Sequence, residues 1–255
     1  FLIFFSQGWN LQIHRLGAVF KEFGNLFRVH GFIFFGPPIA VSIAGEFNLI
    51  PVEWFLGFLF LSILPTTISS CVVYTSLAEG DSASALGHAT LSNLMAMIWV
   101  PFAWILFVEG SEGEWLDRSV RVGQEVIPKI ALLFICPSFL GWYVRSRYFQ
   151  RRALWMNNWF QKVSFIGILV LVYIAFSETI SGLGKTEFIS LFMILFPYLI
   201  GFLTGHLILS WVGIFWASNK AEVKIAEFFC ISQKSLAMGL PLLAVINGND
   251  FKSGG

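Results

Sequence analysis

Long apolar runs separated by short polar breaks constrain the fold of this chain more than any other feature. A bilayer core requires roughly 20 apolar residues per membrane-crossing helix. By this measure the chain contains the tail of one span at residues 1–8 and then a series of further spans. These lie near 25–45, 52–79, 82–108, 124–144, 161–180, 187–217 and 222–247. The sequence therefore predicts an all-α, multi-pass integral membrane protein.

The composition supports this class. Hydrophobic residues make up 56% of the chain and charged residues only 12%, whereas about 25% of the residues of a soluble domain are charged. A soluble domain of this length could not bury 29 Phe and 10 Trp. The net charge of +1 gives no reason to expect a nucleic-acid partner, so the expected partners are the lipid bilayer and a small solute. Nothing in the pattern sets the oligomeric state.

Basic residues collect in alternate loops. They lie after the first span (Arg15, Lys21, Arg28), at 145–160 (Arg145, Arg147, Arg151, Arg152) and near 220 (Lys220, Lys224). Because loops rich in Lys and Arg remain on the cytoplasmic side, these loops are expected to be cytoplasmic. The membrane is expected to be a plasma membrane or a bacterial inner membrane.

The segment LPTTISSCVV, residues 64–73, interrupts the span at 52–79. Pro65 lacks a backbone donor and clashes with the preceding turn, so the helix is expected to break there. Irregular backbone at membrane depth is tolerated only where it is buried in protein or lines a wet cavity, and Thr66, Thr67, Ser69 and Ser70 would supply hydroxyl groups to such a cavity. The alternative is a simple proline kink, with the Ser and Thr side chains bonded back to their own helix.

A second polar interruption lies in EFFCISQKSLAMGLPLLAVINGND, where residues 232–235 (Ser-Gln-Lys-Ser) fall inside an apolar run. The two segments share a layout, since Pro65 precedes Gly80 by fifteen residues and Gln233 precedes Gly248 by the same number. Interrupted spans at corresponding positions of two halves point to a transporter with a site near the bilayer midplane. We therefore expect both breaks to line a solute site.

These two segments, with CISQKSLAMGLP in the second, resemble the bile acid:sodium symporter family. The resemblance is closest to its divergent branch, which includes the seventh human member and bacterial relatives. It implies an inverted-repeat fold, sodium/bile acid symporter-like and NhaA-like, in which two discontinuous helices cross at the centre beside a panel domain. Transport by alternating access would then rock the panel against the core.

The resemblance also implies a domain organisation. Residues 1–255 would form a single transmembrane domain, with 1–108 the remainder of the first inverted repeat and 119–255 most of the second. Because the chain begins in the middle of an apolar run, we expect it to be a fragment that lacks the first and last spans.

In sodium-dependent members of that family, a Ser-Asn pair, hydroxyl groups on the next span, a Glu and a Gln hold the ion. Here Ser70 and Cys71 stand at the Ser-Asn position, Gln233 matches the family glutamine, and Phe229 stands where the glutamate belongs. The nearest polar substitutes on the next span are Thr90, Ser92 and Asn93. Hard cations require oxygen ligands, so these losses argue against sodium coupling of the usual kind. Any sodium ion is expected at Ser70, Asn93 and Gln233.

Lys234 is the most costly residue of the second interruption, since a lysine at the centre of a membrane helix costs at least about 2.5–3.5 kcal/mol. We hypothesise that its ammonium takes the structural place of a cation or titrates in proton coupling. The alternatives are an ion pair with Glu227, about two turns earlier, or a side chain that reaches water. The residues His88 and His206 are expected to be neutral and structural, and Gly201 and Gly205 are expected to allow close helix packing.

The predicted function is secondary active transport of an organic anion, either bile acid-like or sulfated steroid-like or another carboxylate. The alternative is a non-transporting membrane regulator of calcium homeostasis. No catalytic motif such as H-E-x-x-H or G-x-S-x-G is present, so we expect no enzyme and no cofactor, with Na⁺ or H⁺ as the candidate coupling ion. The candidate binding residues are Thr66, Thr67, Ser69, Ser70, Cys71, Thr90, Asn93, Ser232, Gln233, Lys234 and Ser235.

Overall fold

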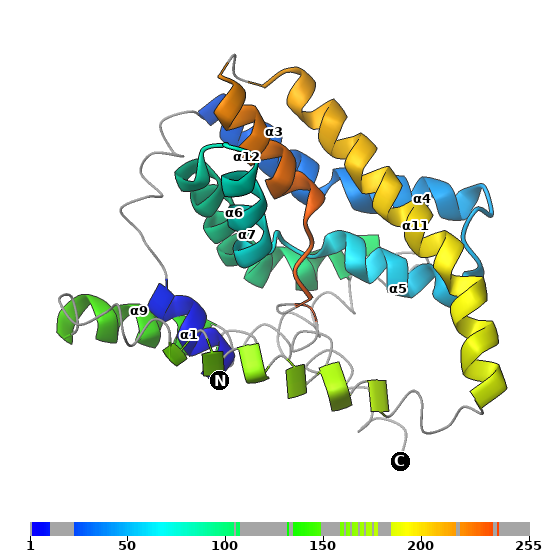
Figure 1. The fold of residues 1–255 in the computed structure, drawn as a ribbon, viewed down its shortest axis with the longest axis horizontal. Helices are drawn as coiled ribbons and strands as arrows, with labels where there is room; N and C mark the ends of the chain where they lie inside the picture. The colour runs from blue at the N-terminus through cyan, green and yellow to red at the C-terminus, as the bar shows by residue number, and fades with distance from the viewer. Residues whose placement is uncertain are drawn as a thin grey trace. The chain divides into compact units, whose positions relative to one another are not determined.

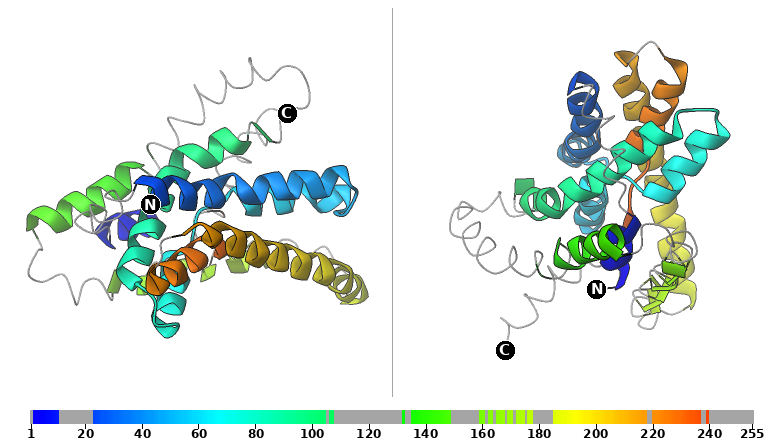
Figure 2. Two further views of the ribbon diagram at one scale, coloured as in Figure 1. Left: turned by 90° about the horizontal axis from the view of Figure 1, so that it is seen from above. Right: turned by 90° about the vertical axis from the view of Figure 1, so that its left-hand side faces the viewer.

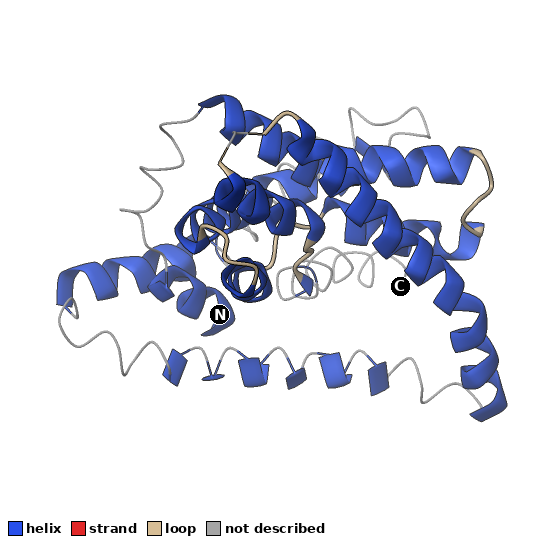
Figure 3. Cartoon of the chain, turned by 45° about the horizontal axis from the view of Figure 1, so that its top comes forward, coloured by secondary structure: helices blue, strands red, loops and turns tan. Residues whose placement is uncertain are grey.

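The computed structural model describes most of the N-terminal half of the chain and the helices that follow it. The described residues are 2–10, 23–104, 106–107, 132, 135–148, 159–160, 162–163, 165–167, 169–170, 172–174, 176–177, 185–217, 220–236 and 239. Regular structure within these ranges is helical, and none of it is a strand (Figure 3). The all-α prediction is therefore confirmed for the described part of the chain.

The chain divides into two compact units. The first consists of Phe1–Gln12, Arg121–Leu195 and Leu240–Gly255, and the second consists of Ile13–Val120 and Phe196–Gly239. Both polar interruptions lie in the second unit.

In the first unit, α1 (Leu2–Asn10) packs closely against α9 (Cys136–Tyr148). Two glycines permit this contact, because a Cβ atom at Gly8 would collide with the backbone of Ser138 and one at Gly141 with the carbonyl oxygen of Phe5. The Ser138 hydroxyl donates to the Phe4 carbonyl at 3.1 Å, which ties the two helices together. The contact thus depends on small residues that let two backbones approach.

The second unit contains the helices around the two interruptions (Figure 1). They are α3 (Phe23–Phe34), α4 (Gly36–Glu46), α5 (Val52–Ile63), α6 (Ile68–Leu77), α7 (Ser82–Trp104), the part of α11 (Lys185–Phe215) from Phe196 onward, and α12 (Ala221–Ser232). Helix α12 packs against α3, α6 and α7, and these helices lie beside it in the views of Figure 2.

Some of the predicted spans can be compared with the helices. Within the described residues, Phe23–Glu46 and Glu187–Phe215 are long and apolar enough to cross a membrane, and the bent pair of α5 and α6 would add a third. These agree with the spans predicted at 25–45, 187–217 and 52–79. Helix α7 lies inside the predicted span 82–108 but buries several polar side chains. Most of the spans predicted at 124–144 and 161–180, and the second half of 222–247, lie outside the described residues.

The turn between α6 and α7 places α12. Glu79 adopts a φ of 58°, and the following Gly80 packs so tightly that a Cβ atom there would lie 2.6 Å from a methyl carbon of Ile225 in α12. The next amide, that of Asp81, donates to the Glu222 carbonyl at 2.9 Å. The Asp81 carboxylate caps α7, because it accepts the Ala83 amide at 2.9 Å. The start of α12 is thereby fixed to the end of α6.

Helix α11 leaves large apolar side chains exposed, such as Met193 at 71%, Trp211 at 66% and Phe215 at 70%. In a membrane protein such side chains can face lipid. A Cβ atom at Gly201 or Gly205 would meet no heavy atom within 4 Å. The prediction that these glycines pack closely against a helix of this chain is therefore wrong for the described structure.

Candidate functional site

The first interruption separates two helices. Helix α5 ends at Ile63, the backbone at Leu64 is extended (ψ 153°), and α6 begins at Ile68 after an extended Thr67 (ψ 122°). The axes of α5 and α6 are bent by 68° across this gap. The gap contains Pro65, whose missing N–H and rigid ring oppose a continuous helix.

The second interruption follows α12. This helix ends at Ser232, and Gln233 is extended with a φ of −95° and a ψ of 135°. The chain turns helical again within a few residues, since the Gly239 amide donates to the Ser235 carbonyl at 3.2 Å. The extended stretch can be followed below the end of α12 in Figure 1.

The two interruptions are bonded to each other, and we call residues 64–67 and 233–235 together the junction. The Ser235 amide donates to the Pro65 carbonyl at 2.8 Å, and the Thr67 hydroxyl donates to the Lys234 carbonyl at 2.7 Å. The Thr66 hydroxyl donates to the carbonyl of Cys230, in the last turns of α12. Backbone groups that leave the helical pattern therefore find partners in the other interruption, as buried backbone groups require.

Helix α7 supplies the remaining partners of Thr66. The Ser92 hydroxyl accepts the Thr66 amide at 3.3 Å, and the Asn93 side-chain amide donates to the Thr66 carbonyl at 2.7 Å. The same Asn93 group also donates to the Ala89 carbonyl at 2.7 Å. Ser92 and Asn93 are both buried, so they act as fixed supports of the first interruption.

Side chains next to the junction also meet across it. The Ser70 hydroxyl lies 3.3 Å from Gln233 Oε1, and the Sγ atoms of Cys71 and Cys230 lie 3.1 Å apart. Both thiols are free and fully buried, whereas Cys136 is exposed. Cys71 and Cys230 therefore belong to the buried interior of the second unit, whereas Cys136 does not.

Lys234 points its ammonium at backbone oxygens. Its Nζ lies 2.6 Å from the Ile33 carbonyl oxygen, 2.8 Å from that of Ser62 and 2.9 Å from that of Leu64. An ammonium has three N–H donors, so each donor has its own acceptor. The residue is half-buried.

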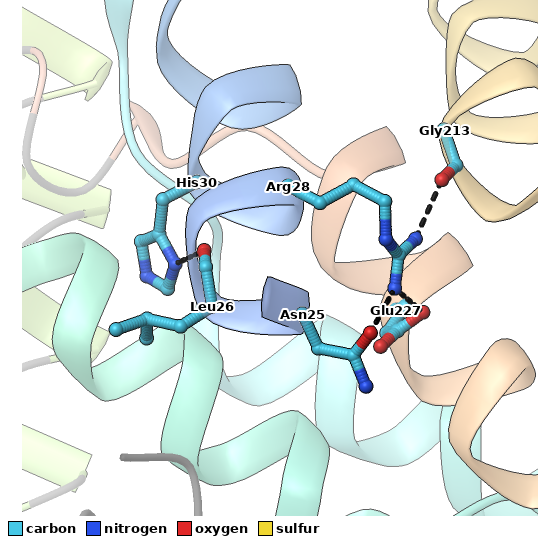
Figure 4. Close-up of polar contacts among 6 residues, drawn as sticks. All are labelled: Asn25, Leu26, Arg28, His30, Gly213 and Glu227. Atoms are coloured by element: carbon cyan, nitrogen blue, oxygen red, sulfur yellow. Dashed lines mark hydrogen bonds and ion pairs between the residues drawn. The ribbon is translucent and has the colours of Figure 1, made fainter. Parts of the chain in front are cut away.

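Glu227 has a different partner from the one considered above. Its side chain is fully buried and accepts from Arg28 at 2.7 Å, while the Arg28 side chain is 13% exposed (Figure 4). Arg28 also donates to Asn25 Oδ1 at 2.9 Å and to the Gly213 carbonyl at 2.6 Å. An ion pair between Lys234 and Glu227 is thus contradicted. Arg28 lies within α3, so the prediction that it belongs to the loop after the first span is wrong.

The structure brings most of the candidate residues together, but three make no hydrogen bond across the junction. Ser69 is exposed on the first turn of α6, and the Ser232 hydroxyl turns back to the Phe229 carbonyl of its own helix at 3.4 Å. Thr90 is buried in α7, and none of the hydrogen bonds described for the junction involves it.

The helix ends at the junction carry opposite partial charges. The last turn of α5 ends there with its carbonyl groups, while α6 begins there with its N–H groups. Thr67 occupies the N-cap position of α6 but makes no side-chain cap bond, because its hydroxyl is bonded to Lys234. The first amides of α6 therefore form a partly exposed, positively polarised end.

The oxygen atoms predicted for a sodium ion are divided between two places. Ser70 and Gln233 meet at the junction, whereas Asn93 supports Thr66 from α7. Within the described ranges, no group of three or more His, Cys, Asp or Glu side chains is arranged to hold a metal ion. The side chains that the structure brings together thus offer a hard cation few oxygen ligands.

Several features of the site carry no clear signal in the sequence. The three carbonyl groups around Lys234 are backbone atoms, and the support from Ser92 depends on the approach of α7. A pair of buried imidazoles, His30 and His88, lies beside the junction helices with ring centres 5.5 Å apart. His206 bonds the Phe202 carbonyl at 3.2 Å, which agrees with the structural role expected for it.

The described residues form apolar helices and no strands, and a polar junction joins two interrupted helices, as is typical of membrane transport proteins. The sequence model of the SBF-like CPA transporter family matches residues 1–254. The chain belongs to this family and is an integral membrane protein. The resemblance to the bile acid:sodium symporters is thereby confirmed.

Proteins with similar sequences carry names of the same kind. The chain is 28% identical over 259 residues to "Putative symporter YfeH" of Escherichia coli (strain K12), covering 96% of this chain and 72% of that protein. It is 23% identical over 259 residues to "Sodium/bile acid cotransporter 7" of Danio rerio, covering 96% and 72%. The Mus musculus protein of the same name is 25% identical over 258 residues, covering 96% and 71%.

Proposed function

We propose that this protein is a secondary active transporter that moves an organic anion by alternating access and binds it beside the junction. The observation that carries the proposal is the mutual bonding of the two interruptions through Pro65, Thr67 and Ser235. Two segments about 170 residues apart in sequence thus place their helix ends and polar side chains at one point. Discontinuous helices of this kind form solute sites in transporters.

The anionic character of the solute is argued from α6. Its first amides are polarised positively, and the exposed Ser69 adds a hydroxyl donor to this helix start, whereas the Ser70 hydroxyl donates to Gln233. Lys234 contributes less directly than its charge would suggest, because its three donors are occupied by carbonyl groups. The names of the relatives favour a bile acid-like or sulfated steroid-like anion, or another carboxylate.

The proposal includes the fold that such transport requires. Helices α5 and α6 would form one discontinuous span, and α12 with the segment after it would form the other. Residues 1–108 and 119–255 would belong to two inverted repeats, with the basic segments on the cytoplasmic side. Phe229 in place of a carboxylate favours coupling that does not use the family's usual sodium ligands, and a proton remains the other candidate ion.

A solute screen followed by uptake tests the proposal. The purified protein is heated with taurocholate, steroid sulfates and small carboxylates, and a solute that raises the Tm is then offered to proteoliposomes. We expect saturable uptake that falls about tenfold to hundredfold in Ser69→Ala or Gln233→Ala, since a hydrogen bond to a charged group contributes about 1.5–3 kcal/mol. Thr204→Ala serves as the control, because this exposed α11 hydroxyl bonds only its own helix at Ile200.

Two results would contradict the proposal. One is the absence of both stabilisation and uptake for every anion offered, which is what a non-transporting regulator would give. The other is uptake that Ser69→Ala, Gln233→Ala and Thr204→Ala leave equally unchanged, which would place the solute away from the junction.

A further inference from the structure

The ammonium of Lys234 sits in a cage of three backbone carbonyl oxygens. They belong to Ile33, Ser62 and Leu64, and they lie between 2.6 and 2.9 Å from Nζ. No carboxylate of the described residues lies within ion-pair distance of this ammonium, since Glu227 pairs with Arg28. A cation held by neutral carbonyl groups alone resembles an ion in a binding site more than a partner in a salt bridge.

Prolines explain why these carbonyl groups are available. In a regular helix the Ile33 carbonyl would accept the amide of residue 37, but residue 37 is proline and has no N–H. The Ser62 carbonyl would accept the amide of residue 66 or, in a tighter turn, residue 65. Residue 65 is proline, and the Thr66 amide donates to Ser92. Pro37 and Pro65 therefore leave acceptors unpaired within their own helices, and Lys234 satisfies them.

The cage is also electrostatically suited to a single positive charge. Ile33 lies in the last turn of α3, and Ser62 and Leu64 lie at the end of α5. The C-terminus of α5 carries about half an elementary negative charge, and Ile33 adds a carbonyl oxygen from the point where α3 continues into α4. The last turn of α5 has no basic residue of its own, which leaves Lys234 to supply the positive charge from another segment.

We propose that the carbonyl oxygens of Ile33, Ser62 and Leu64 form a monovalent-cation site that Lys234 fills permanently with its own ammonium. Lys234 is therefore a tethered cation that makes the junction independent of free sodium or potassium. Shortening the side chain opens the site to a free cation from solution. The consequence for transport rests on the proposed function, but the binding itself does not.

Lys234→Ala removes three methylene groups and the ammonium, which together correspond to propylammonium. The purified variant is heated in propylammonium chloride, potassium chloride or sodium chloride, with tetramethylammonium chloride as the control at equal ionic strength. Tetramethylammonium has no N–H donor and is too large for the cage. Three further proteins are measured in parallel: wild type, Lys234→Met, which fills the space without charge, and Lys224→Ala, which removes a lysine of α12 outside the cage.

We expect Lys234→Ala to have a lower Tm than wild type and to regain most of the loss with propylammonium, in a saturable manner. Potassium should restore part of it, because carbonyl cages suit potassium. For wild type, Lys234→Met and Lys224→Ala, the Tm of each protein should be the same in all four salts. In proteoliposomes, uptake by Lys234→Ala should become dependent on the added cation.

The proposal is overturned if propylammonium and potassium stabilise Lys234→Ala no more than tetramethylammonium does. It is also overturned if sodium or potassium raises the Tm of wild type saturably and more than tetramethylammonium does. This second measurement uses wild type alone, so it still decides the question if Lys234→Ala does not fold. Failure of uptake alone, with cation binding intact, would count against the proposed transport function and leave the cation site standing.

Discussion

Loss of the Glu227 carboxylate should destabilise the second unit strongly. Glu227→Ala leaves the Arg28 guanidinium in place, 13% exposed and without the oxygen that lies 2.7 Å away. Breaking a buried ion pair from one side costs about 3–5 kcal/mol. Asn25 and the Gly213 carbonyl still accept from Arg28, so we expect the lower end, about 3 kcal/mol. At about 2–4 °C per kcal/mol for a chain of this size, the Tm should fall by about 6–12 °C.

The assay is thermal unfolding of the purified protein in detergent, with two comparison variants. Glu222→Ala removes an exposed carboxylate of the same helix and should leave the Tm unchanged. Arg28→Met combined with Glu227→Leu removes both charges and should be more stable than Glu227→Ala alone, because no buried charge is left unpaired. The reasoning is refuted if Glu227→Ala matches Glu222→Ala, or if the double variant is no more stable than the single one.

Three further perturbations test the packing and the junction. Gly141→Ala should lower stability by about 1–3 kcal/mol, since its Cβ atom would collide with the Phe5 carbonyl and force α1 and α9 apart; an unchanged Tm would contradict this. Asn93→Ala should cost about 1–3 kcal/mol by leaving a buried carbonyl group unpaired, and a neutral effect would show that water replaces the amide. Mild oxidation with iodine should link Cys71 to Cys230, whose Sγ atoms lie 3.1 Å apart; mass spectrometry that finds no such link would place α6 and α12 further apart.

The helical class of the chain was predictable from its sequence. Whether a helix ends or continues at a given proline was not. Pro65, Pro101 and Pro197 all lie in apolar runs, yet Pro101 and Pro197 lie inside the continuous helices α7 and α11. At Pro65 the helix ends, and there α7 and the segment after α12 supply partners for the freed backbone groups. These partners are distant in sequence, so local pattern alone cannot distinguish a break from a tolerated proline.

The environment of Lys234 shows a similar limit. The sequence identifies a costly lysine and offers a carboxylate on the same helix as its partner. The structure instead pairs Glu227 with Arg28 and gives Lys234 three backbone oxygens. Backbone acceptors leave no residue signature, and only the prolines at 37 and 65 hint that carbonyl groups are free.

Small residues were also ambiguous. The spacing of Gly201 and Gly205 is typical of close helix packing, but both face open space among the described residues. Gly8 and Gly141, which do permit a close contact, lie on helices far apart in sequence. The spacing of small residues along one helix shows which face would allow close packing. Which helix packs there, if any, is decided by the tertiary structure.

The central claim is that the solute binds where the two interruptions meet. The most direct test is the rate at which a water-soluble maleimide labels Ser69→Cys, a position exposed at the start of α6. Cys71 and Cys230 are buried, and the exposed Cys136 provides an internal control. We predict that a solute which stabilises the protein slows labelling at position 69 in a saturable manner and leaves Cys136 unaffected. Labelling at position 69 that is equally fast at every concentration of a stabilising solute would contradict the account.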